Sequence, residues 1–233
     1  MRIAVISDIH SNLEALTRVL ATIDRFSVDR IYCLGDIVGY GPYPNECIDL
    51  VRKRCHVVVK GNHDSGVVGE TPLEDFNSYG RSAIIWTRKK ITKERSTYLE
   101  LLPFHAIEED VTLVHASPAS PAEWTYVFSW PAAEEAFQAF NTSLCFIGHT
   151  HSPVIIADDG TIGALQRGKR YLINAGSTGQ PRDGIPSACF ALFDSESWTC
   201  TIERVTYDVK KTDRAIRARR LPPYLGIRLY TGT

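Results

Sequence analysis

The 233-residue chain has no long hydrophobic run and no pair of cysteines in a C-x-x-C arrangement. A helix that spans a bilayer needs about 20 consecutive apolar residues, so the sequence predicts no membrane segment. The six cysteines are scattered, and Cys33, Cys145 and Cys189 lie in apolar stretches, where a free thiol behaves as a small buried hydrophobe. Disulfide scaffolds are shorter and much denser in cysteine. We therefore expect free thiols and a cytoplasmic protein.

An excess of charge of one sign is absent as well. Lysine and arginine number 26 and aspartate and glutamate 27, which gives a formal net charge of -1 and no bulk attraction to nucleic acid or anionic lipid. The chain is 44% hydrophobic and 23% charged, which is typical of a globular protein with a core. Its length suits one α/β domain or at most two small ones. The apolar part of the N-terminus is too short for a signal peptide, so we expect residues 2–7 to form the first strand.

The first sixty residues alternate between expected strands and helices. Buried strands rich in Ile and Val are expected at 2–7, 29–34 and 56–59. Ser11, with glutamate three residues later, is expected to cap a helix, and Pro44 to open a second one. This β-α-β-α-β order predicts a parallel sheet covered by helices.

The remaining chain is expected to hold a helical insert at about 71–102, then strands, then a helical tail at about 210–230. The insert divides into helices at 75–90 and 93–102, with Thr92 as N-cap of the second. The turn residues Asp158-Asp159-Gly160 predict a hairpin. Strands are expected at 111–115, 144–148, 154–157, 171–174, 188–193 and 199–206. We find no internal repeat and no linker, and therefore predict a single domain over 1–233.

Side chains able to bind metals follow the ends of several expected strands. The carboxyl ends of strands in open α/β sheets meet at one crevice, so these side chains are expected to lie together. Gly35, Gly61 and Gly148 each precede one of them and are expected to permit the tight turns that aim the ligands inward. The predicted ligands are Asp8, His10, Asp36, Asn62, His115, His149 and His151.

Two carboxylates, four imidazoles and one amide oxygen are too many ligands for one tetrahedral zinc. They fit two divalent transition metals that share a bridging carboxylate, whether Mn, Fe, Zn or Ni. Two metals about 3.5–4 Å apart can clamp a phosphoryl group and generate a hydroxide between them. The sequence therefore predicts a hydrolase of phosphate esters.

Five blocks of sequence resemble, in order and approximate spacing, the calcineurin-like metallophosphoesterases, and the resemblance covers about 2–183. Gly39-Tyr40-Gly41-Pro42 and the segment 176–182 are similar to a small single-domain prokaryotic subgroup. One departure is Ala116, which follows His115 where many relatives have glycine. The five blocks are Asp8-Ile9-His10, Gly35-Asp36, Gly61-Asn62-His63-Asp64, His115 and Gly148-His149-Thr150-His151.

The resemblance implies a four-layer α-β-β-α sandwich with mixed sheets, and a role for each matching residue. A metal-bridging hydroxide would attack phosphorus while His63, which would not bind metal, protonates the leaving oxygen as general acid. Asp64 would orient His63. The implied ligands are Asp8, His10 and His151 for the first metal and Asn62, His115 and His149 for the second, with Asp36 as the bridge.

Other features are open to two interpretations. Arg182 would bind substrate phosphate or lie in a surface turn. The aromatic residues of 124–130 would form a wall for a base or aryl group, or pack on the sheet. The basic tail would touch nucleic acid or, as the neutral net charge favours, be the solvated face of a helix. His56 and His105 are interpreted as structural or surface residues.

The substrate is expected to be a small-molecule phosphate ester or a nucleotide. Whether the enzyme prefers monoesters or diesters, and its oligomeric state, are left open by the sequence. Two alternative functions are a catalytically silent binding module of the same fold and a nuclease or nucleotide phosphatase. The complete set of ligands argues against the silent module, because loss of activity normally removes a ligand or the acid.

Overall fold

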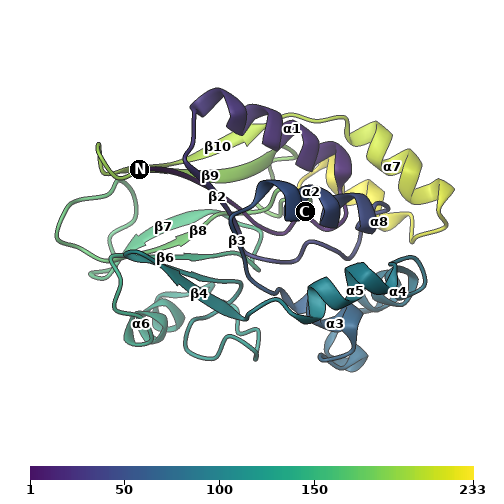
Figure 1. The fold of residues 1–233 in the computed structure, drawn as a ribbon, viewed down its shortest axis with the longest axis horizontal. Helices are drawn as coiled ribbons and strands as arrows, with labels where there is room; N and C mark the ends of the chain where they lie inside the picture. Colours follow the sequence, from purple (N-terminus) through teal and green to yellow (C-terminus); the bar gives the residue numbers. More distant parts are fainter.

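The computed structural model describes residues 1–233, which form two five-stranded mixed sheets with helices on their outer sides (Figure 1). The first sheet contains, in order, β10 (Thr199–Val205), β9 (Ala188–Asp194), β1 (Arg2–Ile6), β2 (Arg30–Cys33) and β3 (Val57–Val58). The second contains β4 (His105–Glu108), β5 (Val111–Val114), β6 (Leu144–Ile147), β8 (Tyr171–Asn174) and β7 (Val154–Ala157).

The helices are α1 (Leu13–Ile23), α2 (Pro44–Arg54), α3 (Asn62–Val68), α4 (Ser78–Arg88), α5 (Lys93–Glu100), α6 (Trp130–Gln138), α7 (Val209–Ala218) and α8 (Tyr224–Ile227). Three single 3-10 turns are η1 (Asp24–Phe26), η2 (Leu73–Asp75) and η3 (Arg228–Tyr230). None of the helices is long and apolar enough to cross a bilayer.

Strand direction places the loops that carry the predicted ligands at common edges. β1, β2 and β3 are parallel, with Ile6 opposite Cys33 and Cys33 opposite Val58, so these three strands end at the same edge of the first sheet. β5, β6 and β8 are likewise parallel in the second sheet, while β4 and β7 run antiparallel at its margins. Each parallel set therefore delivers its following loop to one edge.

Three apolar layers hold the sheets and helices together. Residues between the sheets include Val5, Leu34, Phe146 and Ile173, from both sheets. On the outer side of the first sheet, α1 and α2 pack over Ile6 and its neighbours, and on the outer side of the second sheet α6 packs over β6 and β8 (Figure 1). β1 is buried on both faces, as its unbroken apolar run predicts. The four-layer α-β-β-α sandwich with mixed sheets is confirmed.

The structure differs from the sequence-based prediction at three helices. The N-cap of α1 is Asn12, whose side chain accepts a hydrogen bond from the Ala15 amide, so the prediction of Ser11 was wrong by one residue. The segment after β3, predicted as a turn, is the first turn of α3, whose glycines and polar residues give no helical pattern. α6 was not predicted, although proline in its first turn is a recognised start signal.

The tail folds back onto the ligand-bearing loops. α7 and α8 are separated by a break at Pro222-Pro223. Apolar side chains of the tail form one buried cluster with Tyr40 and Ala83. The Gly184 amide also donates a hydrogen bond to the Gly232 carbonyl, 2.9 Å away, which joins the tail to the loop after β8. The tail thus lies against the same edge of the molecule as the predicted ligands.

Candidate metal centre

The predicted ligands lie together where the parallel strands of the two sheets end. All are buried except Asn62, which is half-buried. Their ligating atoms fall into overlapping groups within 4.8 Å of one another. The groups are Asp8, His10 and His151; His10, Asp36 and His63; and Asp36, His115 and His149.

Several of these residues occupy a backbone conformation that side chains other than glycine rarely adopt. The left-handed region costs roughly 1–2 kcal/mol per residue, less for Asp and Asn, and strain of this kind concentrates at functional sites. Hydrogen bonds between neighbouring loops stabilise this backbone conformation, because the main-chain amides of Asp8 and His10 donate to the carbonyls of Gly35 and Asp36. The candidate ligands with positive φ are Asp8 (52°), His10 (49°), Asp36 (51°), His149 (64°) and His151 (59°).

The glycines before the ligands serve two different purposes. Gly35 has a φ of +92° and supplies the tight turn that was predicted. Gly61 and Gly148 do not have a positive φ, so the prediction that they are needed for tight turns is wrong. A Cβ on Gly61 would lie 2.2 Å from Oδ1 of Asp36, and one on Gly148 would lie 2.0 Å from Oγ of Ser7. Both are needed because two loops approach each other there without room for a side chain.

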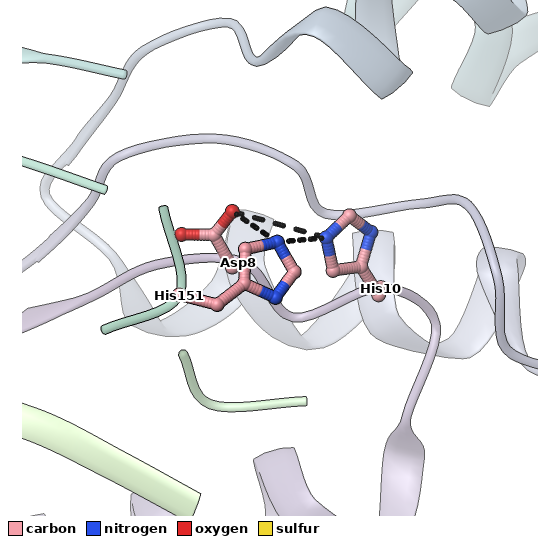
Figure 2. Close-up of side chains that lie close together, drawn as sticks. All are labelled: Asp8, His10 and His151. Carbon is pink, nitrogen blue, oxygen red and sulfur yellow. Dashed lines mark hydrogen bonds and ion pairs between the residues drawn. The ribbon is translucent and has the colours of Figure 1, made fainter. Parts of the chain in front are cut away.

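Asp8, His10 and His151 form the first cluster, drawn in Figure 2. Nε2 of His151 lies 3.2 Å from Oδ1 of Asp8 and 3.1 Å from Nε2 of His10 (Figure 2). Nε2 of His10 lies 3.8 Å from the same Asp8 oxygen. The other carboxylate oxygen, Oδ2, accepts hydrogen bonds from the Ser7 hydroxyl and the His149 amide. Asp8 is therefore held by one oxygen while the other faces two imidazole nitrogens.

Main-chain carbonyls fix the orientation of three imidazoles. Nδ1 of His10 lies 3.1 Å from the Val38 carbonyl, and Nδ1 of His151 lies 2.5 Å from the Gln180 carbonyl. Nδ1 of His115 lies 2.8 Å from the carbonyl of Leu34. Since a carbonyl only accepts, each Nδ1 carries the proton, and each Nε2 of a neutral ring presents its lone pair. Two such lone pairs face each other across 3.1 Å between His10 and His151, which is repulsive unless a cation lies between them.

Asp36 lies between the first cluster and a second. Its Oδ2 is 3.5 Å from Nε2 of His10 and 3.4 Å from Nε2 of His115. Its Oδ1 accepts a 2.8 Å hydrogen bond from the His63 amide. Nδ1 of His149 lies 3.2 Å from Nε2 of His115, which completes the second group. One carboxylate oxygen thus faces both clusters, as the shared ligand of two ions would.

Three buried polar atoms of the seven predicted ligands make no hydrogen bond: Oδ1 of Asp8, Oδ1 of Asn62 and Nε2 of His149. An unpaired buried polar group costs roughly 1–3 kcal/mol, so three in one place require a partner. Oxygen and imidazole nitrogen are the donors that divalent transition metals accept. The residues present therefore fit a metal centre.

The electrostatics of the site show where positive charge is favoured. Burial opposes charge on Asp36, but His115 and His63 outweigh it and hold the pKa of Asp36 well below its usual range. Burial likewise opposes charge on His115, but Asp36 outweighs it and raises the pKa of His115 to about 9. Burial lowers the pKa of His149 to about 3. With this raised pKa, His115 is protonated at pH 7 in the metal-free protein, so a metal ion that binds at its Nε2 must displace a proton.

His63 lies beside the two clusters with its ring enclosed by aromatic neighbours. Ring centroids are 4.4 Å apart to Tyr40 and 5.1 Å to Phe76. Its Nδ1 is buried without a hydrogen-bond partner. Burial, opposed by the charge of Asp36 and helped by that of Arg182, lowers the pKa of His63 to about 4. The ring is therefore neutral at pH 7 in the ligand-free protein.

Asp64 does not hold His63 in the way predicted. Its carboxylate accepts hydrogen bonds of 3.1 Å from the amides of Val38 and Gly61, and makes none with the His63 ring. Burial, together with the charge of Asp36, raises the pKa of Asp64 to about 7. Asp64 caps α3 and ties the loops after β2 and β3 together, so any effect on His63 passes through the backbone of that helix.

Arg182 reaches toward the site but has no carboxylate partner. Its Nη2 donates to Oε1 of Gln180 at 2.8 Å, and its Cζ lies 5.7 Å from the Tyr40 ring centroid. His56 and His105 lie outside the site: His56 accepts from the Ile31 amide and His105 is exposed on β4. Tyr40 had no predicted role, although the segment that contains it had been singled out.

Within the aromatic segment 124–130, one ring packs against the protein and two others extend from the candidate site. Trp124 is structural, since its indole N–H donates to the Thr71 hydroxyl at 3.1 Å. The Tyr126 ring stacks on the His149 ring at 3.9 Å, with 19° between the planes. Phe128 stacks on Tyr126 at 5.1 Å and 14°. Two exposed rings thus continue outward from a candidate ligand.

Comparison with known proteins relates this chain to phosphoesterases. A model of the calcineurin-like phosphoesterase superfamily domain matches residues 1–197. The crystal structure of a metallophosphoesterase from Sphaerobacter thermophilus has a TM-score of 0.90 and 42% identity, over 100% of this chain and 99% of that one. An uncharacterized protein of Methanocaldococcus jannaschii is 46% identical over 99% of this chain and 98% of its own. Phosphodiesterase YfcE of Escherichia coli is 25% identical over 84% of this chain and 89% of its own.

Proposed function

The chain belongs to the calcineurin-like phosphoesterase superfamily and is a metal-dependent hydrolase of phosphate esters, and we propose that it works with two divalent metal ions. The donor set suits Mn, Fe, Zn or Ni. The proposed substrate is a small-molecule phosphomonoester or phosphodiester, nucleotides included. The proposed ligands are Asp8, His10 and His151 for one ion and Asn62, His115 and His149 for the other, with Asp36 shared.

The observation that carries this proposal is the set of unpaired buried acceptors around Asp36. Oδ1 of Asp8 belongs to the first cluster and Nε2 of His149 to the second, while Oδ1 of Asn62 is on the residue after Gly61, which lies against Asp36. Each cluster thus has at least one ligand atom without a partner, and Oδ2 of Asp36 faces both. One ion would leave the unpaired atoms of the other cluster without a partner, which supports two.

When bound, the ions would supply positive charge that neutralises the phosphate and lowers the pKa of water toward about 7. Around them, the protein would position the phosphoryl group and shield it from bulk water, because the walls of the site are buried. Arg182 would donate N–H bonds to a phosphate oxygen. His63 would donate a proton to the leaving oxygen as the ester bond breaks.

The low pKa of His63 affects its proposed role as the proton donor to the leaving oxygen. A group with a pKa of about 4 gives up a proton readily but carries one only rarely at pH 7. A bound phosphate dianion would add negative charge beside the ring and raise this pKa. We therefore propose that His63 gains its proton together with the substrate rather than before it.

Nothing specific in the structure supports nucleic-acid binding over small esters. Several cations of the basic tail are engaged within the molecule. Lys211 pairs with Glu14 at 3.0 Å, and Arg217 pairs with Asp213 at 2.9 Å. Arg219 lies over the Tyr43 ring at 4.4 Å. These contacts agree with the interpretation of the tail as a partly solvated helical face.

The direct test combines metal analysis with an ester panel. Protein purified without chelator is expected to carry close to two transition-metal ions per chain and to hydrolyse aryl phosphate mono- or diesters. Chelation should abolish the activity, and addition of one of the proposed metals should restore it. A fully metal-loaded protein that is inert toward every ester class would instead support the silent binding module.

The aromatic rings beyond His149 are proposed to contact the organic group of the substrate. Tyr126 is 45% exposed and Phe128 69% exposed, although both have large apolar faces. Phe128 and Trp130 also line a groove of about 500 Å³ with Pro153 and Ile162. A planar aryl or base group would stack on these rings, because every such group has a π-face.

Replacement of Phe128 by Ala should therefore raise KM for aryl esters by roughly 5- to 150-fold, the range that loss of one stacking contact gives. The kcat of the same substrates should change little, since Phe128 lies outside the ligand clusters. Phe128→Leu removes the ring but keeps apolar bulk, so it should raise KM for aryl esters about as much as Phe128→Ala if stacking is the cause, and a methyl ester serves as the substrate that cannot stack. Equal effects on the aryl and methyl esters would contradict the assignment.

A further inference from the structure

Nδ1 of His63 lacks the hydrogen bond that orients other imidazoles of the site. In His10, His115 and His151 this atom faces a main-chain carbonyl, whereas in His63 it is buried without a partner. The Asp64 carboxylate does not supply the missing bond, because its partners are main-chain amides. The last torsion angle of a histidine side chain is broad and roughly twofold, so such a ring can turn unless its neighbours prevent it. The orientation of His63 must therefore depend on packing.

Two buried aromatic side chains contact the His63 ring. The Phe76 ring lies 5.1 Å away between centroids, with 70° between the planes, and the Tyr40 ring lies 4.4 Å away at 52°. Edge-to-face and tilted arrangements at such distances are favoured geometries for aromatic pairs. We call Phe76 and Tyr40 the aromatic cage of His63. A third ring, that of His10, lies 4.8 Å away at 80°, but it belongs to a proposed metal ligand.

Glycines allow the backbone to approach these rings closely. A Cβ on Gly39 would lie 2.4 Å from Nδ1 of His63, and one on Gly66 would lie 2.8 Å from Cζ of Phe76. Tyr40, which follows Gly39, has a φ of 50°, a conformation that costs free energy in a residue other than glycine. The loop after β2 thus closes off Nδ1, and Nε2 is the ring nitrogen left to serve a substrate.

Phe76 comes from the helical insert and lies outside the five sequence blocks. It follows the 3-10 turn η2 and shortly precedes α4. Gly80 of α4 also lies against the site, since a Cβ there would be 3.5 Å from Cε1 of His63 and from Oη of Tyr40. Phe76 is at the same time part of the apolar core on the outer side of the first sheet. A test must therefore separate its contact with His63 from its share in stability.

We propose that Phe76 is a positioning residue for His63: with Tyr40, it holds the imidazole in the orientation from which the ring gives its proton to the leaving oxygen. The helical insert thereby supplies the support that the resemblance assigned to Asp64. This inference rests on the proposed function, because it concerns the acid of that reaction. A misplacement of about 1 Å can lower a rate about 100-fold, so loss of the cage should have a measurable effect.

The kinetic test is Phe76→Leu, which removes the ring and keeps apolar bulk. It should lower kcat about 10- to 100-fold for alkyl phosphate esters and less than about 3-fold for nitrophenyl esters, which need no acid. Metal content should stay at the wild-type value. Phe140→Leu is the matched control, because Phe140 is a buried phenylalanine packed on Phe137 in the cluster that α6 forms with the second sheet. It should affect both ester classes equally, and thermal unfolding compares the stability of the two variants.

A double-mutant cycle distinguishes positioning from a general structural effect. In the His63→Ala background, Phe76→Leu should lower kcat for alkyl esters by less than about 2-fold, because no imidazole remains to be positioned. The same loss with and without His63 would overturn the inference. So would an equal loss on alkyl and nitrophenyl esters in the Phe76→Leu single variant.

A spectroscopic measurement separates this inference from the proposed function. Ring-carbon relaxation of labelled histidine is recorded by NMR on chelated, metal-free protein, where no hydrolysis occurs. The His63 ring should be rigid in the wild type and in Phe140→Leu, and more mobile in Phe76→Leu, with weaker Overhauser contacts to Tyr40. If no ester is hydrolysed but this difference holds, the cage stands and the proposed function fails. A His63 ring equally rigid in Phe76→Leu would overturn the inference even in an active enzyme.

Discussion

Replacement of Asp36 by Asn is expected to lower kcat at least about a thousandfold, which corresponds to about 4 kcal/mol of transition-state stabilisation. The reason is the position of Oδ2, which lies within 3.5 Å of Nε2 of both His10 and His115. A neutral amide is a poorer ligand than a carboxylate and does not bridge two cations. Metal content should fall from two ions per chain to one or fewer, measured by elemental analysis of the same samples used for kinetics.

The control for Asp36→Asn is Asp49→Asn, a carboxylate of the surface pair with Arg95. It should leave both metal content and kcat unchanged. Asparagine can still accept the amide of His63 through Oδ1, so the fold should be kept, and thermal unfolding checks this. Full metal content together with kcat near the wild-type value would exclude Asp36 as the shared ligand, and with it the proposed geometry.

Replacement of His63 by Ala is expected to lower kcat for alkyl phosphate esters by about 100- to 10,000-fold, the range of general acid catalysis. The loss should shrink toward zero for nitrophenyl esters, because an acidic leaving group departs without help. Metal content should stay at the wild-type value, since in the proposed mechanism His63 donates a proton and binds no ion. The plot of log kcat against leaving-group pKa should therefore become steeper in the variant.

The close approach of His63 to Asp36 and His10 makes metal analysis the deciding measurement for this variant. If His63→Ala loses an ion, His63 is a ligand and its proposed role is wrong. His105→Ala is the matched control, because His105 is exposed on β4 and remote from the ligand clusters. A uniform loss across all leaving groups with metal retained would point to positioning of the phosphate rather than protonation.

Much of the site could be predicted because its residues follow strongly apolar strands. Asp8 and Asp36 come just after runs that are buried on both faces, and chain direction then decides that such loops share an edge. The resemblance added the grouping of ligands and the four-layer fold. That grouping stays a prediction, supported by the unpaired atoms of Asp8, Asn62 and His149.

What could not be predicted depends on tertiary contacts without a local signal. α3 contains Gly66 and polar residues that disfavour an isolated helix, and burial with the cap from Asp64 overrides this. The resemblance assigned Asp64 to the His63 ring, yet the hydrogen-bond partners of its carboxylate are the amides of Val38 and Gly61. The C-terminal tail contains no motif, and the packing of Leu225 and Leu229 on Tyr40 arises only in the folded chain.

The main-chain anchoring of the imidazoles has a consequence for how the sequence can diverge. His10, His115 and His151 are oriented by the carbonyls of Val38, Leu34 and Gln180, and every amino acid possesses a carbonyl. Substitutions at those three positions can accordingly accumulate without turning the rings, provided that the replacement side chains still fit. Homologues can thus differ at these three positions while the orientation of the histidine rings is kept. A search for residues that covary with these histidines should find none at the three positions.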